Sequence, residues 1–250
     1  MPKFFFNKND ISRGQVQLFG EDEKHIKTVL RAREGEEITL CDGEGMDYQC
    51  RIASLERGVL LDILSKEVCE TEPKVKITLY QGLPKADKME LIIQKCVELG
   101  VDRIVAVSTE RAIVKLDKKE AKKLERWQKI AEAAAKQSGR GKIPEIGQQV
   151  LKFKDAVAEA KGLDGAIIPY EREQERGIRQ FVQDFKGESK TIGVFIGPEG
   201  GFAEEEIALA QENGITPITL GKRSLRTETA GMTTTAILLY ELDSGGKEMI

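Results

Sequence analysis

The pattern of apolar and polar positions changes once along the chain, close to residue 72. Before that point, short alternating runs are separated by turns rich in Asp and Gly, such as the DGEG turn at 42–45. The predicted strands cover 37–41, 48–52 and 58–64. One helix is predicted at 21–33, with Ile26, Val29 and Leu30 on one face. Short strands with Gly-bearing turns at this spacing favour a small β-barrel.

After a polar segment with a proline at 71–74, buried strands alternate with amphipathic helices. The predicted strands cover 75–80, 103–107, 166–169, 191–196 and 216–220, and the predicted helices cover 87–99, 117–137, 153–161, 204–212 and 229–242. Gly100 is the expected C-terminal cap of the first of these helices, and Asp117 is the expected N-cap of the second. This alternation predicts an α/β fold whose parallel sheet is covered on both faces. We therefore expect two domains, at 1–72 and 73–250.

Composition excludes some classes of protein and leaves one charge feature open. Of the 250 residues, 40% are hydrophobic and 32% are charged, which is typical of a folded globular protein. No apolar run is long enough to span a membrane, and the N-terminus lacks the pattern of a signal peptide, so a cytoplasmic protein is predicted. The net charge is −3, yet residues 111–142 contain eleven Lys and Arg against four Asp and Glu. That segment fits either a surface for nucleic-acid phosphates or a solvated lysine-rich helix.

The cysteines and the histidine do not indicate a metal site. Cys41, Cys50, Cys69 and Cys96 form no CxxC pair, and His25 is the one histidine of the chain. A zinc site needs about four clustered ligands, so no metal is predicted. We expect the cysteines to be thiols packed as small apolar groups, although two disulfides stay an alternative. His25 lies beside an apolar stripe, and a structural role is expected for it.

Two glycine-containing loops follow late strands and precede helices. The first has the sequence IGPEGGF at 196–202, and the second covers 220–231. Glycines allow positive φ and close approach of a ligand, and the carboxyl ends of parallel strands are where open α/β sheets hold ligands. Thr227 or Thr229 is expected to cap the last helix, leaving Arg226 and Glu228 available to a ligand. Neither a Walker loop nor a dinucleotide fingerprint is present. Each loop alone is compatible with a simple turn, but two charged loops at neighbouring strand ends favour a shared site.

These loops also carry a resemblance to a known family. IGPEGGF, followed by an acidic helix and then LGxxxLRTETA, is similar to the cofactor-binding signature of SPOUT RNA methyltransferases. Within that class the chain resembles the bacterial family that methylates N3 of a uridine in 16S ribosomal RNA. Further matching segments are HIKTVLR at 25–31, the run 85–101, the ER pair at 110–111 and QSGR at 137–140. Lys136 departs from the family pattern, in which an acidic residue is expected.

The resemblance implies a fold, a cofactor and partners. It implies an N-terminal PUA-like β-barrel that binds RNA, and a C-terminal SPOUT domain with a parallel sheet and a trefoil knot, which is an exception to ordinary topology. It further implies S-adenosyl-L-methionine as cofactor, 16S ribosomal RNA of the small subunit as substrate, and a homodimer. The cofactor-binding residues that it implies are Gly197, Pro198, Glu199, Gly200, Gly201, Leu220, Gly221, Leu225, Arg226, Thr229 and Ala230.

Roles in chemistry and RNA binding are expected as follows. Arg226 is the candidate for stabilising an ionised uracil, with Glu199 or Glu228 positioning the base or accepting its proton. The expected phosphate contacts are Arg31, Arg33, Arg111, Lys115, Arg140 and Lys142. Three alternatives stay open: a non-catalytic RNA-binding module, a SPOUT enzyme that acts on transfer RNA, and an enzyme whose Gly-rich loops bind nucleotide phosphates. The last lacks the required lysine and hydroxyl placement.

Overall fold

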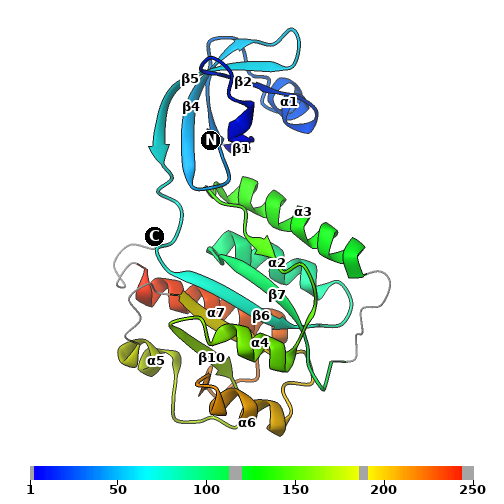
Figure 1. Ribbon diagram of the computed structural model, residues 1–250, viewed down its shortest axis with the longest axis vertical. Coiled ribbons are helices and arrows are strands. Elements are labelled where there is room, and N and C mark those ends of the chain that lie inside the picture. The colour runs from blue at the N-terminus through cyan, green and yellow to red at the C-terminus, as the bar shows by residue number, and fades with distance from the viewer. Residues whose placement is uncertain (1–2, 113–119, 186–190, 244–250) are drawn as a thin grey trace. The chain divides into compact units, whose positions relative to one another are not determined.

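The computed structural model describes residues 3–112, 120–185 and 191–243 (Figure 1). The chain divides into two compact units, Met1–Glu72 with Ala135–Ile143, and Pro73–Ala134 with Pro144–Ile250. We expected one break after residue 72, so the grouping of Ala135–Ile143 with the first unit departs from that expectation. A short segment far along the chain therefore completes the N-terminal unit.

The first unit is built on a curled five-stranded sheet. Its strands, in spatial order, are β1 (Lys3–Phe5), β3 (Glu37–Cys41), β4 (Met46–Ser54), β5 (Val59–Val68) and β2 (Gln15–Leu18). All neighbours pair antiparallel except β1 and β3, which pair parallel. The three predicted strands are therefore present, but β1 and β2 were missed because runs of three and four residues are too short to show alternation.

The predicted helix of this unit takes a different form. Helix α1 covers Glu21–Lys24 and continues as a π-helical turn over His25–Val29. Ile26 is buried as expected, but Val29 is 66% exposed. The wider π turn changes the angular spacing, so residues three apart no longer share one face. The His25 ring packs edge-on against Phe4 at 5.6 Å between ring centroids, which is the structural role expected for it.

The segment 135–143 is held to the first unit by the Glu72 carboxylate. This carboxylate accepts hydrogen bonds from the Arg140 guanidinium at 2.7 Å and from the main-chain N–H groups of Gly141 and Lys142, at 2.8 and 3.1 Å. Lys136, the departure from the family pattern, forms an ion pair with Asp22 at 3.3 Å. These contacts explain why residues 135–143 pack with the N-terminal sheet.

All four cysteines are buried thiols, as predicted. Burial raises the pKa of Cys41 to about 12 and that of Cys50 to about 11. At neutral pH both side chains therefore stay protonated, and they act as small apolar groups in the core.

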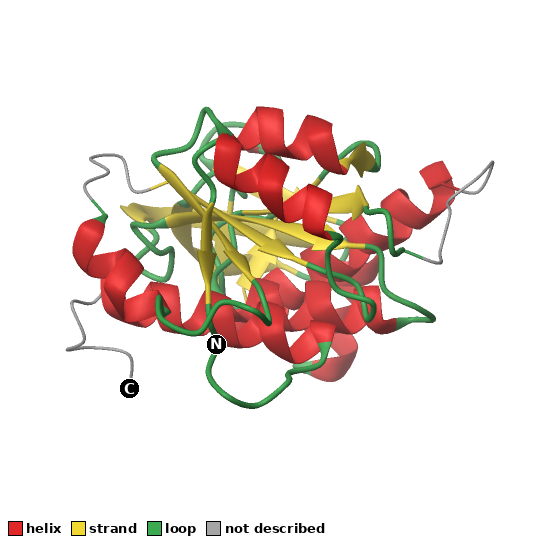
Figure 2. Ribbon diagram, turned by 90° about the horizontal axis from the view of Figure 1, so that it is seen from below, coloured by secondary structure: helices red, strands yellow, loops and turns green. Residues whose placement is uncertain are grey.

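The second unit contains a parallel sheet. In spatial order its strands are β12 (Thr216–Ile218), β10 (Gly165–Pro169), β11 (Thr191–Ile196), β6 (Lys76–Gly82), β7 (Arg103–Ser108) and β8 (Glu145–Ile146), with β9 (Leu151–Lys152) also pairing with β7. Every described pair is parallel. The helices are α2 (Lys88–Leu99), α3 (Glu120–Ser138), α4 (Phe153–Ala160), α5 (Ile178–Asp184), α6 (Glu204–Glu212) and α7 (Thr227–Leu242). Helices lie on both faces of the sheet, which confirms the predicted α/β class (Figure 2).

Buried strands and one glycine cap hold this unit together. Tyr80 and Phe195, from the adjacent strands β6 and β11, stack at 4.4 Å between ring centroids. Gly100 ends α2 with φ +112°, as predicted, and a Cβ there would lie 2.7 Å from Pro73. Asp117 lies outside the described residues, and the trefoil knot stays a prediction. No helix of the described residues is long and apolar enough to cross a membrane.

Candidate functional site

Four loops meet at the carboxyl edge of the parallel sheet. They are 83–87 after β6, 109–112 after β7, 197–203 after β11 and 219–226 after β12. Because the strands are parallel, these ends lie on one edge, where open α/β sheets hold ligands. The first glycine loop is the third of this group, and the second glycine loop (220–231) consists of the fourth together with the first residues of α7.

The first glycine loop is fixed at its far end by Glu206 of α6. The buried carboxylate of Glu206 accepts hydrogen bonds from the N–H groups of Ala203 and Glu110, each at 2.9 Å. The Arg111 guanidinium also donates to the carbonyl oxygen of Gly200 at 3.2 Å. The loop after β7 is therefore joined to the first glycine loop. Glu206 was missed from the sequence, because nothing in its local pattern distinguishes it from the acidic residues beside it.

The two glycine loops are joined by Thr227, the first residue of α7. Its hydroxyl donates to the carbonyl oxygen of Gly197 at 2.6 Å. We expected Thr227 or Thr229 to cap this helix, and that expectation was wrong. The N-cap is Arg226, which provides no side-chain cap, and the Thr227 hydroxyl is used across the site instead.

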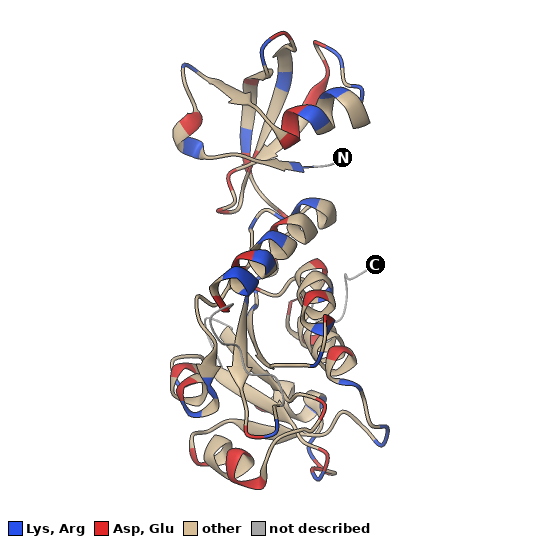
Figure 3. Cartoon of the chain, turned by 90° about the vertical axis from the view of Figure 1, so that its right-hand side faces the viewer, with Lys and Arg blue, Asp and Glu red and all other residues tan. Residues whose placement is uncertain are grey.

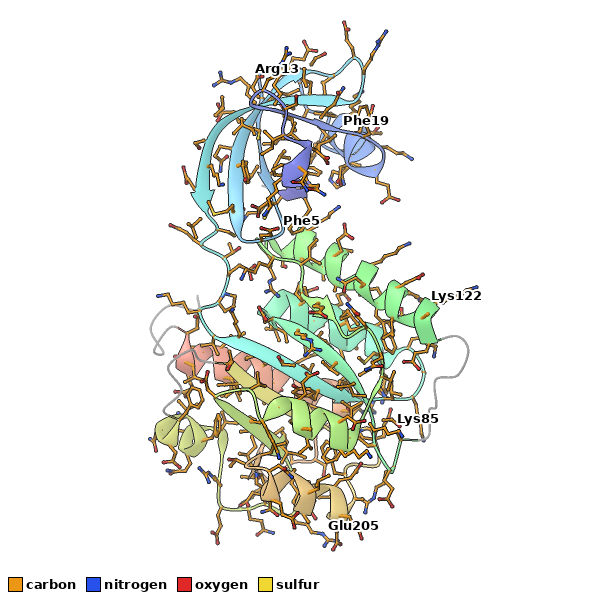
Figure 4. All side chains as sticks on the ribbon, in the orientation of Figure 1. Phe5, Arg13, Phe19, Lys85, Lys122 and Glu205 are labelled. Atoms are coloured by element: carbon orange, nitrogen blue, oxygen red, sulfur yellow. The ribbon has the colours of Figure 1, made fainter. Side chains whose placement is uncertain are left out.

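Lys88, at the start of α2, forms a second link between the loops. Its ammonium group lies 3.0 Å from the Glu199 carboxylate and 3.3 Å from that of Glu228. The main-chain N–H of Lys85 also donates to both carboxylate oxygens of Glu199 at 3.2 Å. Figure 4 labels Lys85 in this loop between β6 and α2. Lys88 was missed because its partners lie more than a hundred residues away in sequence.

These contacts bear on the expected role of Glu199. Burial alone would raise the pKa of Glu199, but the hydrogen bonds from Lys88 and from main-chain N–H groups outweigh it and hold the pKa below its ordinary value. A carboxylate with a lowered pKa is a weak proton acceptor at neutral pH. The geometry therefore favours Glu199 as an anchor of its loop rather than as a general base.

The loops also offer groups that a nucleoside cofactor requires. Within the described residues, the main-chain N–H and C=O groups of Leu220 and Leu225 have no hydrogen-bond partner. Gly201 and Gly221 have positive φ, and a Cβ on either would meet open space. Unpaired main-chain donors and acceptors beside half-buried leucines suit the edge and the face of a purine. The residues present therefore fit S-adenosylmethionine.

The residues expected to contact RNA phosphates differ in how exposed they are. Arg31 and Arg33 are exposed in the first unit, and Arg111 is exposed in the second. Lys142 is half-buried, and Lys115 lies outside the described residues. Arg140 is only 3% exposed and is paired with Glu72, so the expectation that it contacts phosphate needs correction. Its guanidinium neutralises a buried carboxylate instead.

The basic segment of the sequence, residues 111–142, includes helix α3. Lys and Arg positions recur along α3 (Figure 3). Lys122, Lys123 and Arg126 of this helix are exposed. Both interpretations of the basic segment are compatible with this exposure.

Within the described residues, no group of three or more His, Cys, Asp or Glu side chains is arranged to hold a metal ion.

Comparisons with known proteins give the family. Residues 71–239 match the family of RNA methyltransferase domains, and residues 20–64 match the RNA methyltransferase PUA domain. A protein of Bacillus subtilis (strain 168) called ribosomal RNA small subunit methyltransferase E is 35% identical to this chain, and the match covers 90% of both chains.

Two solved structures extend the similarity to the fold. A ribosomal RNA small subunit methyltransferase E from Neisseria gonorrhoeae, bound to S-adenosyl methionine, is 35% identical with a TM-score of 0.83, covering 95% of this chain and 96% of that one. A Legionella pneumophila protein in complex with the bound cofactor SAM is 34% identical with a TM-score of 0.80, covering 94% and 96%. This chain therefore belongs to the RNA methyltransferase family that includes the ribosomal RNA small subunit methyltransferases E.

Proposed function

We propose that this protein transfers the methyl group of S-adenosylmethionine to N3 of a uridine in 16S ribosomal RNA of the small subunit. The observation that carries the proposal is the joining of the two glycine loops, through Thr227 and Gly197 at 2.6 Å, at the carboxyl edge of the sheet. Relatives of similar length are named for small-subunit ribosomal RNA, and two similar structures contain the same cofactor. We place the reaction in the cytoplasm, where ribosomal subunits are available.

In this proposal the chain's own residues bind and align the reactants. The cofactor, when bound, supplies an already activated methyl group. The main-chain groups of Leu220 and Leu225 would hold its adenine, and the glycines of both loops would let the backbone approach it. The protein must then align the acceptor nitrogen with the methyl carbon. Positioning of this kind lowers the activation barrier by about 7–11 kcal/mol.

Arg226 is the proposed catalytic residue. Uracil N3 carries a proton at neutral pH, and releasing that proton to water from a group whose pKa lies about two units above ambient costs roughly 2.7 kcal/mol. A guanidinium beside O2 or O4 of the base would offset this cost. Arg226 is exposed at the N-terminus of α7, directly between Leu225 and Thr227. It is therefore next to both the proposed adenine site and the link between the loops.

The test of the function is a direct transfer assay. The protein and cofactor labelled in the methyl group are incubated with small subunits from a strain that lacks the enzyme, with naked 16S RNA and with transfer RNA, and the modified base is mapped. We expect label on N3 of one uridine of 16S RNA. Label in transfer RNA alone would favour the alternative substrate, and the absence of saturable cofactor binding would favour a non-catalytic module.

Phosphate binding by the exposed arginines gives a salt-dependent prediction. We propose that Arg33 of the first unit contacts an RNA phosphate, so Arg33→Ala should lower RNA affinity and reduce the slope of log K against log salt by about one. Lys161→Ala, which removes an exposed cation after α4, is the matched control. Equal slopes for the wild type and Arg33→Ala, measured by fluorescence anisotropy, would contradict this contact.

We also propose that the protein is a homodimer, with the second copy covering apolar side chains of α2 and α7. These helices pack together, and Leu91, Ile237 and Tyr240 are 43%, 37% and 43% exposed. Burying a charge in such an interface is costly, so Ile237→Lys should turn a dimer into a monomer in light scattering after size exclusion. A wild type that runs as a monomer at all concentrations would contradict the proposal.

A further inference from the structure

A buried glutamine at the end of β6 is linked by hydrogen bonds to both glycine loops. Gln81 has no exposed surface, and its amide nitrogen donates to the Gly82 carbonyl oxygen and to the Thr227 hydroxyl oxygen, each at 2.9 Å. The Thr227 hydroxyl in turn donates to the Gly197 carbonyl oxygen at 2.6 Å. The hydrogen bonds thus run in one direction, from β6 through the start of α7 to the end of β11.

The orientation of the Gln81 amide follows from its partners. The Gly82 oxygen can only accept, so the nitrogen of the amide must face it. The oxygen Oε1 is thereby turned away, and within the described residues it has no hydrogen-bond partner. On α7, a Cβ at Gly231 would lie 3.5 Å from Oε1. A buried acceptor without a partner lowers stability.

The unpaired oxygen raises the question of why a glutamine occupies position 81. An apolar side chain of the same length would fill this space without a desolvated oxygen, but it would take the donors away from the Gly82 carbonyl and the Thr227 hydroxyl. What the glutamine adds is two donors, one to the last residue of β6 and one to the first residue of α7. A buried polar group that is only partly satisfied is typical of a functional site, where local rules of packing are broken.

The backbone contact between β6 and the first glycine loop is equally close. A Cβ on Gly82 would lie 2.7 Å from the Pro198 ring, so the end of β6 packs directly against that loop. Thr227 follows Leu225 and Arg226, so its position also sets where the second loop ends. The chain of contacts from Gln81 through Thr227 to Gly197 therefore joins the two glycine loops beside the link that Lys88 makes.

We propose that Gln81 and Thr227 are positioning residues that set the separation of the two glycine loops, and thereby the affinity for S-adenosylmethionine. The inference rests on the proposed function, since it assigns these residues to the cofactor site. Neither side chain needs to touch the cofactor. Both act through the backbone of the loops that would hold it.

The experiment compares cofactor affinity with thermal stability in matched variants. Gln81→Met and Thr227→Val remove the donors with little change of volume, Thr227→Ser keeps the hydroxyl, and Thr234→Val makes the same change at a buried threonine of α7 outside this chain of contacts. The dissociation constant for S-adenosylmethionine is measured by calorimetry and the melting temperature by differential scanning calorimetry. The KM for the cofactor and kcat are measured in the methyl-transfer assay.

We expect Gln81→Met and Thr227→Val to weaken cofactor binding by about tenfold, the scale of one hydrogen bond. The KM for the cofactor should rise while kcat at saturation changes less. The melting temperature of Gln81→Met should fall by only a few degrees, because removal of the unpaired oxygen partly offsets the loss of the two donated hydrogen bonds. Thr227→Ser should restore wild-type affinity, and Thr234→Val should leave it unchanged.

The outcomes separate this proposal from the proposed function. If the wild type shows no saturable cofactor binding, the proposed function fails. If the wild type binds while Gln81→Met and Thr227→Val bind equally tightly, the positioning role is wrong and the function stands. If Gln81→Met does not fold, the Thr227→Val and Thr227→Ser pair decides by itself. Equal affinities in that pair would overturn the proposal.

Discussion

Replacing Arg226 with alanine is expected to lower kcat about a hundredfold at neutral pH, the effect of removing one charged stabiliser from a transition state. The proposed reaction needs an ionised uracil, and the Arg226 guanidinium is exposed beside the proposed adenine site. Within the described residues it forms no ion pair, so its charge is available to the base. The measurement is steady-state methyl transfer to small subunits, with cofactor affinity determined separately.

A control and a pH series make this prediction specific. Arg223→Ala removes an exposed arginine from the same loop and should keep near wild-type kcat. If Arg226 offsets the cost of ionising the base, the deficit of Arg226→Ala should shrink as the pH rises towards the pKa of uracil N3, because ionisation then needs less help. Full turnover by Arg226→Ala at neutral pH, with unchanged cofactor binding, would rule out this role.

Replacing Glu72 with alanine should destabilise the first unit by about 3 kcal/mol, the loss typical of removing the carboxylate from a buried ion pair. Arg140 is 3% exposed, and its guanidinium would lose the carboxylate that neutralises it. The N–H groups of Gly141 and Lys142 would lose the same acceptor. The loss of unfolding free energy is measured by chemical denaturation, with the cooperative unfolding of the N-terminal sheet as the signal.

The same pair predicts a dependence of stability on pH. Burial alone would raise the pKa of Glu72, but the hydrogen bond and charge of Arg140, with the two N–H groups, hold it below the ordinary value of 4.5. A carboxyl whose pKa is lowered by folding stabilises the protein above its unfolded pKa, and this stabilisation is lost as the pH falls through the folded pKa. The unfolding free energy of the wild type should therefore fall below about pH 4. The fall should be smaller in Glu72→Ala, which lacks this carboxylate.

Two further variants test the Glu72 interpretation. Glu56→Ala, at an exposed position of the same unit, should leave unfolding unchanged. Glu72→Leu combined with Arg140→Met should recover much of the stability lost by Glu72→Ala, since replacing a buried pair with apolar side chains is often close to neutral. An unfolding midpoint of Glu72→Ala equal to that of the wild type would show that the pair contributes nothing.

Local pattern was sufficient for most elements of the second unit. Strand β11 and helix α6 have the predicted bounds, because a buried run followed by an acidic first turn is a signal contained within a few residues. Strands β8 and β9 were missed, since two-residue strands have no periodicity. Helix α5 was missed for a similar reason, at seven residues.

The residues of the candidate site also divide into those found from the sequence and those found only in the structure. The two glycine loops were found from sequence because their glycines, charges and places after strands are local features. Lys88, Glu206 and Gln81 were not found, because each acts on a loop that is distant in sequence and resembles an ordinary helix or strand residue. Arg140 was assigned to RNA from its charge, whereas its partner Glu72 is 68 residues away in the chain.

The sequence by itself determined the α/β class, the change of pattern near residue 72, the thiol state of the cysteines and the two loops, since each depends on residues close together in the chain. Only the tertiary structure decided that residues 135–143 pack with the N-terminal sheet and that one lysine links both loops. It also decided that Lys88 and the main-chain N–H of Lys85 contact the Glu199 carboxylate, which lowers its pKa. These outcomes depend on burial and on charges brought together by folding, and distance along the chain carries no information about either.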